Sequence, residues 1–215
     1  TVAAGRVFVS SDTGALYSLD AVTGCVYWSF QAEGGMRNAV SIAPIKGQAG
    51  KYALYFGDVR ANVYRIDAAT GALLWKVSVE EHPAAQITGA PVLYEDRLYV
   101  PISSAEERAA GVGAAYECCT FRGSVVALDV SNGKRLWKTY IIPDPPKVVG
   151  KTDKGVPRWA PAGAALWMTP TVDAQRRALY IGTGESYPEP SAKTTDAVMA
   201  LDMASGKVLW SVQDT

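Results

Sequence analysis

Residues 14–28 read GALYSLDAVTGCVYW, and the same arrangement returns three more times along the 215-residue chain. Each copy has an alternating apolar segment that ends in Asp, a Thr-Gly, Asn-Gly or Ser-Gly step, and an apolar segment that ends in Trp. The other copies are residues 62–75, 123–137 and 196–210. Alternation at period two predicts half-buried strands, and Gly tolerates the positive φ of a tight turn. The chain is therefore expected to be a repeat protein built from β-meanders.

Two more strands complete the expected unit. An apolar segment precedes each copy, at residues 5–9, 53–57, 97–100 and 178–182. Fourth strands are expected at residues 41–44, 88–92 and 167–172. The Asp can accept turn amides, and the Trp ring can fill the space between neighbouring sheets. Four short strands per unit with Trp at a fixed place predict propeller blades. No stretch keeps a helical period without Gly or Pro breaking it, so no helix is expected.

The spacing between successive repeat tryptophans grows along the chain, which indicates insertions in the later units. We expect one partial β-propeller over residues 1–215, with blades at about 1–34, 35–80, 81–142 and 160–215. The inserted loops fall at about 102–121, 141–165 and 185–196. Long insertions in a compact repeat either decorate the surface or build a site over one face.

Composition excludes several functions. The chain has 21 Lys+Arg and 21 Asp+Glu, so no global charge attracts nucleic acid, and no nucleic-acid partner is expected. One His and three Cys do not form a structural zinc motif. No apolar run is long enough for a membrane span. Cys25, inside the first repeat, is expected to be a small apolar filler.

The Leu-Asp, Thr-Gly, Leu-Trp repeat resembles the β-propeller repeat of quinoproteins that bind pyrroloquinoline quinone (PQQ). That family contains dehydrogenases, such as methanol dehydrogenase, and non-enzymatic propellers, such as an outer-membrane assembly factor. The resemblance implies an all-β, quinoprotein-type β-propeller, with about four four-stranded blades forming part of an eight-bladed ring. A closed four-bladed ring is the alternative. The repeat alone does not choose between enzyme and scaffold.

Residues 116–123, YECCTFRG, carry the most specific resemblance. PQQ alcohol dehydrogenases use a disulfide between adjacent cysteines that stacks on the cofactor, which implies this role for Cys118 and Cys119. Adjacent Cα atoms lie about 3.8 Å apart, below the usual disulfide range, so such a bond needs an oxidising compartment and a supporting fold. A bacterial periplasmic or secreted location follows. The alternative is a pair of free thiols.

Three more residues match the family's cofactor contacts. Arg37 is similar to the arginine that bonds the quinone oxygens, and Thr88, in Thr-Gly-Ala-Pro, is similar to a hydroxyl donor. Trp167, six residues before Asp173, is similar to the tryptophan that forms the floor under PQQ. The alternatives are a solvated loop charge, a strand hydroxyl and an inter-blade core ring, respectively.

The family also binds calcium through oxygen ligands, as a hard cation requires. Glu106, in Ser-Ser-Ala-Glu, resembles the family's first ligand, with Glu107 and Glu117 as alternates. Glu185 follows Gly-Thr-Gly where the family has Asn, which keeps an oxygen but adds charge. Ala165 replaces a family threonine. Solvated loop carboxylates are the alternative for each glutamate.

The family's catalytic aspartate follows the segment that begins here at Trp210, and the sequence ends five residues later. We therefore expect a fragment of an enzyme and assign no catalytic residue within it. The chain most resembles the polyvinyl alcohol dehydrogenase class, which implies oxidation of secondary alcohols, polymeric ones included, to ketones. A c-type cytochrome would accept the electrons; no haem-attachment motif occurs here. The alternative function is a non-catalytic, protein-binding propeller.

Overall fold

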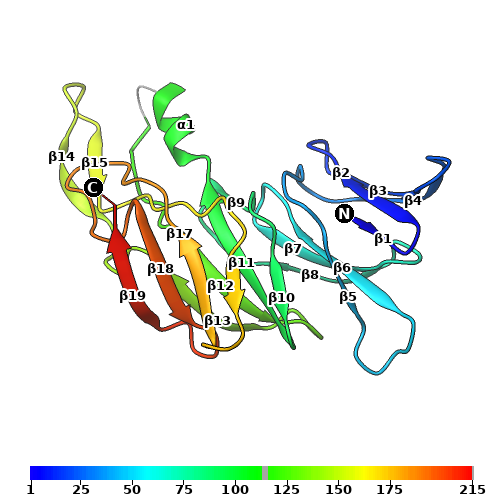
Figure 1. The fold of residues 1–215 in the computed structure, drawn as a ribbon. Coiled ribbons are helices and arrows are strands. Elements are labelled where there is room, and N and C mark those ends of the chain that lie inside the picture. Colours follow the sequence, from blue (N-terminus) through cyan, green and yellow to red (C-terminus); the bar gives the residue numbers. More distant parts are fainter. Residues whose placement is uncertain (113–115, 215) are drawn as a thin grey trace.

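The computed structural model describes residues 1–112 and 116–214, and it consists of antiparallel sheets standing side by side (Figure 1). The first sheet contains β1 (Val2–Ala3), β2 (Arg6–Ser10), β3 (Ala15–Asp20) and β4 (Val26–Gln31). The second contains β5 (Ser41–Pro44), β6 (Tyr52–Gly57), β7 (Asn62–Asp67) and β8 (Leu73–Ser78). Within each sheet, neighbours in sequence are neighbours in space, as in a meander.

The third and fourth sheets repeat this order. The third contains β10 (Val92–Tyr94), β11 (Arg97–Ser104), β12 (Ser124–Asp129) and β13 (Arg135–Tyr140), and β9 (Ala85–Gln86) pairs with the end of β11. The fourth contains β16 (Thr171–Asp173), β17 (Ala178–Gly182), β18 (Ala197–Asp202) and β19 (Val208–Gln213). The hairpin of β14 (Lys147–Lys151) and β15 (Pro157–Ala160) separates them in sequence. The predicted all-β class, with about four four-stranded blades, is confirmed.

The Asp and Gly of each repeat build the turn between the third and fourth strands. In the second sheet, Asp67 Oδ1 accepts hydrogen bonds from the amides of Ala69 and Thr70, both 2.9 Å away. Gly71 follows with a φ of +76°, a conformation that L side chains adopt only with strain. The equivalent Asp residues 20, 129 and 202 accept the same kind of turn bond. The predicted turn chemistry is confirmed.

The repeat tryptophans join one sheet to the next. Trp28 Nε1 donates to the carbonyl of Ala68, directly after the Asp of the second sheet. In the same way, Trp75 of the second sheet donates to the carbonyl of Val130 after the third sheet's Asp, and Trp137 of the third sheet donates to the carbonyl of Met203 after the fourth sheet's Asp. Trp210, the fourth of the series, is 44 % exposed.

The hydrophobic core lies between neighbouring sheets. Separate clusters of buried side chains fill the spaces between the first and second, second and third, and third and fourth sheets. The β5 and β16 strands both contact β10, so the innermost strands of three sheets meet. Helix α1 (Glu106–Val112) and the β14–β15 hairpin project beyond the same end of the sheets (Figure 1).

Three expectations need correction. The inserted segment contains a short helix, α1, because Ser104 Oγ accepts the amide of Glu106 (2.8 Å) and caps a run of strong helix formers. Residues 113–115 of this insertion lie outside the described part of the chain. Cys25 is exposed and is not a core filler. The strands expected at residues 88–92 and 167–172 begin only at Val92 and Thr171. Among the described residues, no helix has the length and hydropathy needed to cross a membrane.

Candidate functional site

A cavity of about 350 Å³ lies where the segments that precede the second, third and fourth sheets meet β9, β11 and α1. Three of the residues predicted to contact the cofactor, Arg37, Thr88 and Trp167, line it together although they are far apart in sequence. Both Thr88 and Trp167 precede the first strands of their sheets, so the late start of β10 and β16 leaves them on irregular backbone. The remaining lining residues are Gln86, Ser103, Ser104, Ala105, Glu107 and Arg108.

The Trp167 side chain is 54 % exposed, which places it at the cavity and not in an inter-blade core. Its ring is seated against Gly184: a Cβ added there would come within 2.7 Å of the Trp167 ring. The Gly184 amide is held in turn by the carbonyl of Ala165 (3.0 Å). Glycine is therefore required beneath this ring, and the ring remains free to contact a bound molecule.

Hydroxyl groups and positively charged guanidinium groups face the cavity. Thr88 Oγ1 and Ser103 Oγ lie 2.8 Å apart, and Ser103 Oγ donates to the carbonyl of Gln86 (3.1 Å). Either hydroxyl of the Thr88–Ser103 pair can be the donor, so the Thr88 hydroxyl can also donate to a ligand oxygen. The guanidinium groups of Arg37 and Arg108, both on exposed side chains, add positive charge. The donor set suits a ligand with anionic oxygens.

Glu107 lines the cavity and interacts with the carboxylate of Glu185. Burial and the hydrogen-bonded carboxylate of Glu185 raise the pKa of Glu107 above its usual range, because two like charges in one site disfavour ionisation. A bound cation would relieve this repulsion. In residues 1–112 and 116–214, no three His, Cys, Asp or Glu side chains converge, so the pair would need further oxygen ligands from a bound molecule or water.

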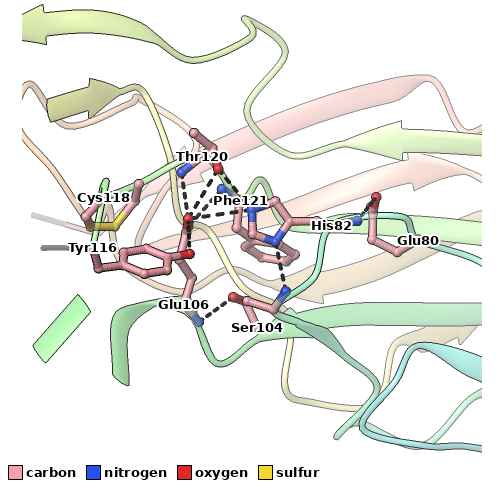
Figure 2. A network of polar contacts seen from close by, with 10 residues as sticks. Glu80, His82, Ser104, Glu106, Tyr116, Cys118, Thr120 and Phe121 are labelled. Carbon is pink, nitrogen blue, oxygen red and sulfur yellow. Dashed lines mark hydrogen bonds and ion pairs between the residues drawn. A yellow bond between two sulfur atoms is a disulfide. The ribbon is translucent and has the colours of Figure 1, made fainter. Parts of the chain in front are cut away.

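Glu106, the first predicted calcium ligand, does not line this cavity. Its side chain is fully buried, and it faces the loop that carries the adjacent cysteines (Figure 2). Burial alone would raise its pKa, but hydrogen bonds from His82 and the amides of Thr120 and Phe121 outweigh burial and hold the pKa below its usual value. The geometry therefore favours Glu107 over Glu106 as a ligand. The other alternate, Glu117, is exposed and is not among the cavity residues.

Cys118 and Cys119 form a disulfide, as the resemblance implied, and are not free thiols. Cys119 is buried and Cys118 is partly exposed. The backbone of the pair is bonded to β15, where the Trp159 amide donates to the carbonyl of Cys118 (2.9 Å). The hairpin therefore supports the disulfide from one side.

The residues described fit a planar, anionic quinone with a calcium ion. Arg37 and Arg108 supply positive charge, Thr88 supplies a hydroxyl, Trp167 supplies an aromatic surface and the Glu107–Glu185 pair supplies oxygens. Ser103 and Arg108 were not expected as cavity residues, and Glu106, expected as the first calcium ligand, lies outside the cavity lining. The Ser104-x-x-Glu107 capping pattern was the available signal, because it predicts where α1 begins.

Comparison with known proteins places this arrangement. The family profile described as "Outer membrane protein assembly factor BamB" (PQQ_2) matches residues 1–151. The polyvinylalcohol dehydrogenase of Sphingopyxis sp. (strain 113P3) is 44 % identical over 214 residues, which are 99 % of this chain and 33 % of that protein. A Pseudomonas polyvinylalcohol dehydrogenase is 42 % identical over 216 residues, covering 100 % of this chain and 34 % of that protein.

A solved structure has the same fold. The quinohemoprotein alcohol dehydrogenase from Comamonas testosteroni superposes with a TM-score of 0.73 at 22 % identity, over 98 % of this chain and 34 % of that one. Four adjoining meander sheets with a cavity where three of them meet define a quinoprotein-type β-propeller arc. The chain belongs to the PQQ_2 family. It spans about a third of the length of the curated relatives it matches.

Proposed function

We propose that this chain forms the cofactor-binding arc of a PQQ- and calcium-dependent alcohol dehydrogenase that oxidises secondary alcohols, polymeric ones included. The observation that carries the proposal is the meeting of Arg37, Thr88 and Trp167 at one cavity. The identity to two polyvinylalcohol dehydrogenases supports the substrate class.

In this proposal, each cavity side chain has a separate task. Arg37 pairs with anionic oxygens of the cofactor, Thr88 holds it by a hydrogen bond and Trp167 forms the floor beneath its ring plane. Cys118 and Cys119 are not among the residues that line the cavity, and they are proposed to contact the cofactor as the covering disulfide. When bound, PQQ would supply a two-electron acceptor for the hydride of the alcohol. The residues of this chain bind and orient the cofactor, and none of them is assigned as the catalytic base.

Calcium is proposed to bind between Glu107 and Glu185, with further oxygens supplied by the cofactor and water. The shared position of the two carboxylates supports this pair, and the hydrogen bonds made by Glu106 argue against that residue. A divalent cation here would neutralise both charges and place a Lewis acid beside the cofactor oxygens.

We propose further that the arc belongs to an eight-bladed ring, with the catalytic aspartate on an adjoining blade. This arrangement is supported by the coverage of the relatives, since the chain spans only about a third of the two polyvinylalcohol dehydrogenases. A disulfide between adjacent residues supports a periplasmic or secreted location. A c-type cytochrome is the proposed electron acceptor.

Reconstitution tests this function. The complete protein is loaded with PQQ and calcium, and dye reduction is followed with secondary alcohols, with primary alcohols as the comparison. The proposal expects turnover that requires both PQQ and calcium and that falls by about tenfold or more in Arg37→Ala. An exposed arginine outside the cavity, Arg135, provides the matched control Arg135→Ala. Absence of PQQ binding and of turnover would support the alternative, a protein-binding scaffold.

A further inference from the structure

Glu106 is the most completely bonded buried acid around the disulfide loop. Its Oε1 accepts from the hydroxyl of Tyr116 (3.1 Å) and the amide of Thr120 (2.9 Å), and its Oε2 accepts from the amide of Phe121 (2.8 Å). The carboxylate is fully buried. A buried carboxylate with several donors forms charge-assisted bonds that are strong and costly to remove.

These donors lie on both sides of the cystine. Tyr116 precedes Cys118, whereas Thr120 and Phe121 follow Cys119, so one carboxylate ties together the two flanks of the disulfide (Figure 2). The backbone of β15 bonds the same pair through Trp159. The loop is therefore fixed by a strand on one side and by Glu106 on the other.

His82 supports the carboxylate from a third segment. The Ala84 amide donates to His82 Nδ1 (3.2 Å), which leaves the proton of the neutral ring on Nε2. Nε2 lies 3.0 Å from Thr120 Oγ1 and 3.5 Å from Glu106 Oε1. The imidazole thus donates toward the loop, and the Thr120 hydroxyl is free to donate to Glu106 (3.3 Å).

We propose that Glu106, supported by His82, is a positioning residue that holds the Cys118–Cys119 disulfide in place. It acts through the loop and touches neither cofactor nor substrate. Its bearing on catalysis rests on the proposed function, but its hold on the disulfide does not. Glu107, the next residue, lines the cavity, so consecutive glutamates of α1 serve two different parts of the site.

The rate of disulfide reduction tests this proposal on the complete protein without cofactor. Dithiothreitol transfers two electrons to Cys118–Cys119, is oxidised to its cyclic disulfide, and leaves two thiols that are trapped by alkylation and counted by mass. Because Cys119 is buried and Cys118 is only partly exposed, opening of the loop increases the access of dithiothreitol to the disulfide. Glu106→Gln puts an NH₂ group against an amide donor, so reduction should be about tenfold faster. Tyr116→Phe, which removes one donor, should give a rise of about threefold.

Glu81→Gln is the matched control, since it removes a nearby exposed carboxylate and should leave the rate unchanged. Hydrogen exchange of the same variants separates positioning from general stability. Faster exchange in residues 116–121, with unchanged exchange in the β5–β8 sheet, is the expected result. An unchanged reduction rate in both variants, or equal acceleration of exchange in both regions, would overturn the proposal. If Glu106→Gln does not fold, Tyr116→Phe decides.

PQQ affinity is measured separately on the parent protein. If PQQ does not bind there, the proposed function fails, whereas the reduction and exchange rates still decide the role of Glu106. The two failures are therefore distinguishable.

Discussion

The Trp28 ring lies directly against the backbone of Gly71, so that a Cβ added at Gly71 would come within 2.7 Å of Trp28 Cε3. The same contact recurs between Trp75 and Gly133 and between Trp137 and Gly206. The glycine of each of these turns thus adopts a positive φ and also leaves room for the tryptophan ring of the preceding sheet. This explains why the Gly and Trp recur at a fixed spacing.

Replacing Gly71 by Ala should destabilise the protein more than the same change in the first repeat. Gly24 has nearly the same φ (+74°) but, among the described residues, nothing within 4 Å of an added Cβ. Gly24→Ala should therefore cost only the left-handed strain, about 1 kcal/mol, whereas Gly71→Ala should cost at least about 1 kcal/mol more. Urea unfolding of the two variants checks this difference. Equal losses would show that the Trp28 contact is unimportant.

Stability should fall in acid partly through Glu80. Burial alone would raise the pKa of Glu80, but the Lys138 ammonium and two backbone amides outweigh it and hold the pKa below its usual value. Because the pKa of Glu80 is lower in the folded than in the unfolded state, its ionised form stabilises the folded protein at neutral pH. This stabilisation is lost as the pH falls below about 5, through the unfolded-state pKa and toward the folded-state pKa.

Glu80→Gln should therefore flatten the dependence of unfolding free energy on pH between about pH 5 and pH 3. At pH 7 it should also cost about 2–3 kcal/mol, because the partly buried Lys138 loses its partner. Urea unfolding over a pH series measures both effects. An unchanged slope in the variant would mean that other carboxylates carry the acid sensitivity.

Calcium affinity should depend on Glu107 and Glu185 together. Since repulsion from Glu185 contributes to the raised pKa of Glu107, Glu107→Gln should make the metal-free protein slightly more stable at pH 7. The same variant should bind calcium about tenfold more weakly, because it loses an anionic ligand. Calcium titration followed by the melting temperature measures both effects. If Glu117→Gln weakens binding as much as Glu107→Gln does, the assigned pair is wrong.

Gly184→Ala should affect cofactor binding through Trp167. The added methyl group would displace the ring from its seat. We expect PQQ affinity to fall by about threefold to tenfold, and Trp167→Ala to show a larger loss. Gly5→Ala is a control at a glycine with no neighbour within 4 Å among the described residues. Quenching of tryptophan fluorescence by PQQ gives the affinities. Identical affinities for Gly184→Ala and the parent protein would contradict the claim that the Trp167 ring position requires glycine at residue 184.

The fold could be predicted because its signal is local and repeated. The Asp, Gly and Trp of each copy form turns and contacts within about two consecutive sheets, so their spacing is visible in the sequence. Helix α1 was missed because it depends on a single cap, Ser104, inside an insertion with no counterpart in the other repeats.

The site was harder to predict than the fold. The Cys118–Cys119 pair stands out in sequence, and its disulfide is confirmed. Glu106 and Glu107 could not be separated, because consecutive residues of a helix point in directions about 100° apart, and where the helix begins decides which one faces the cavity. The hold of His82 on the loop depends on contacts across 38 residues, which no local pattern indicates.

Equilibrium binding of PQQ to the complete protein, with and without calcium, tests the central claim most directly. If Arg37, Thr88 and Trp167 form the cofactor site, PQQ binds in a calcium-dependent manner, and Arg37→Ala and Trp167→Ala each weaken binding by about tenfold or more while Arg135→Ala does not. Lack of PQQ binding, or binding that neither Arg37→Ala nor Trp167→Ala weakens, would contradict it.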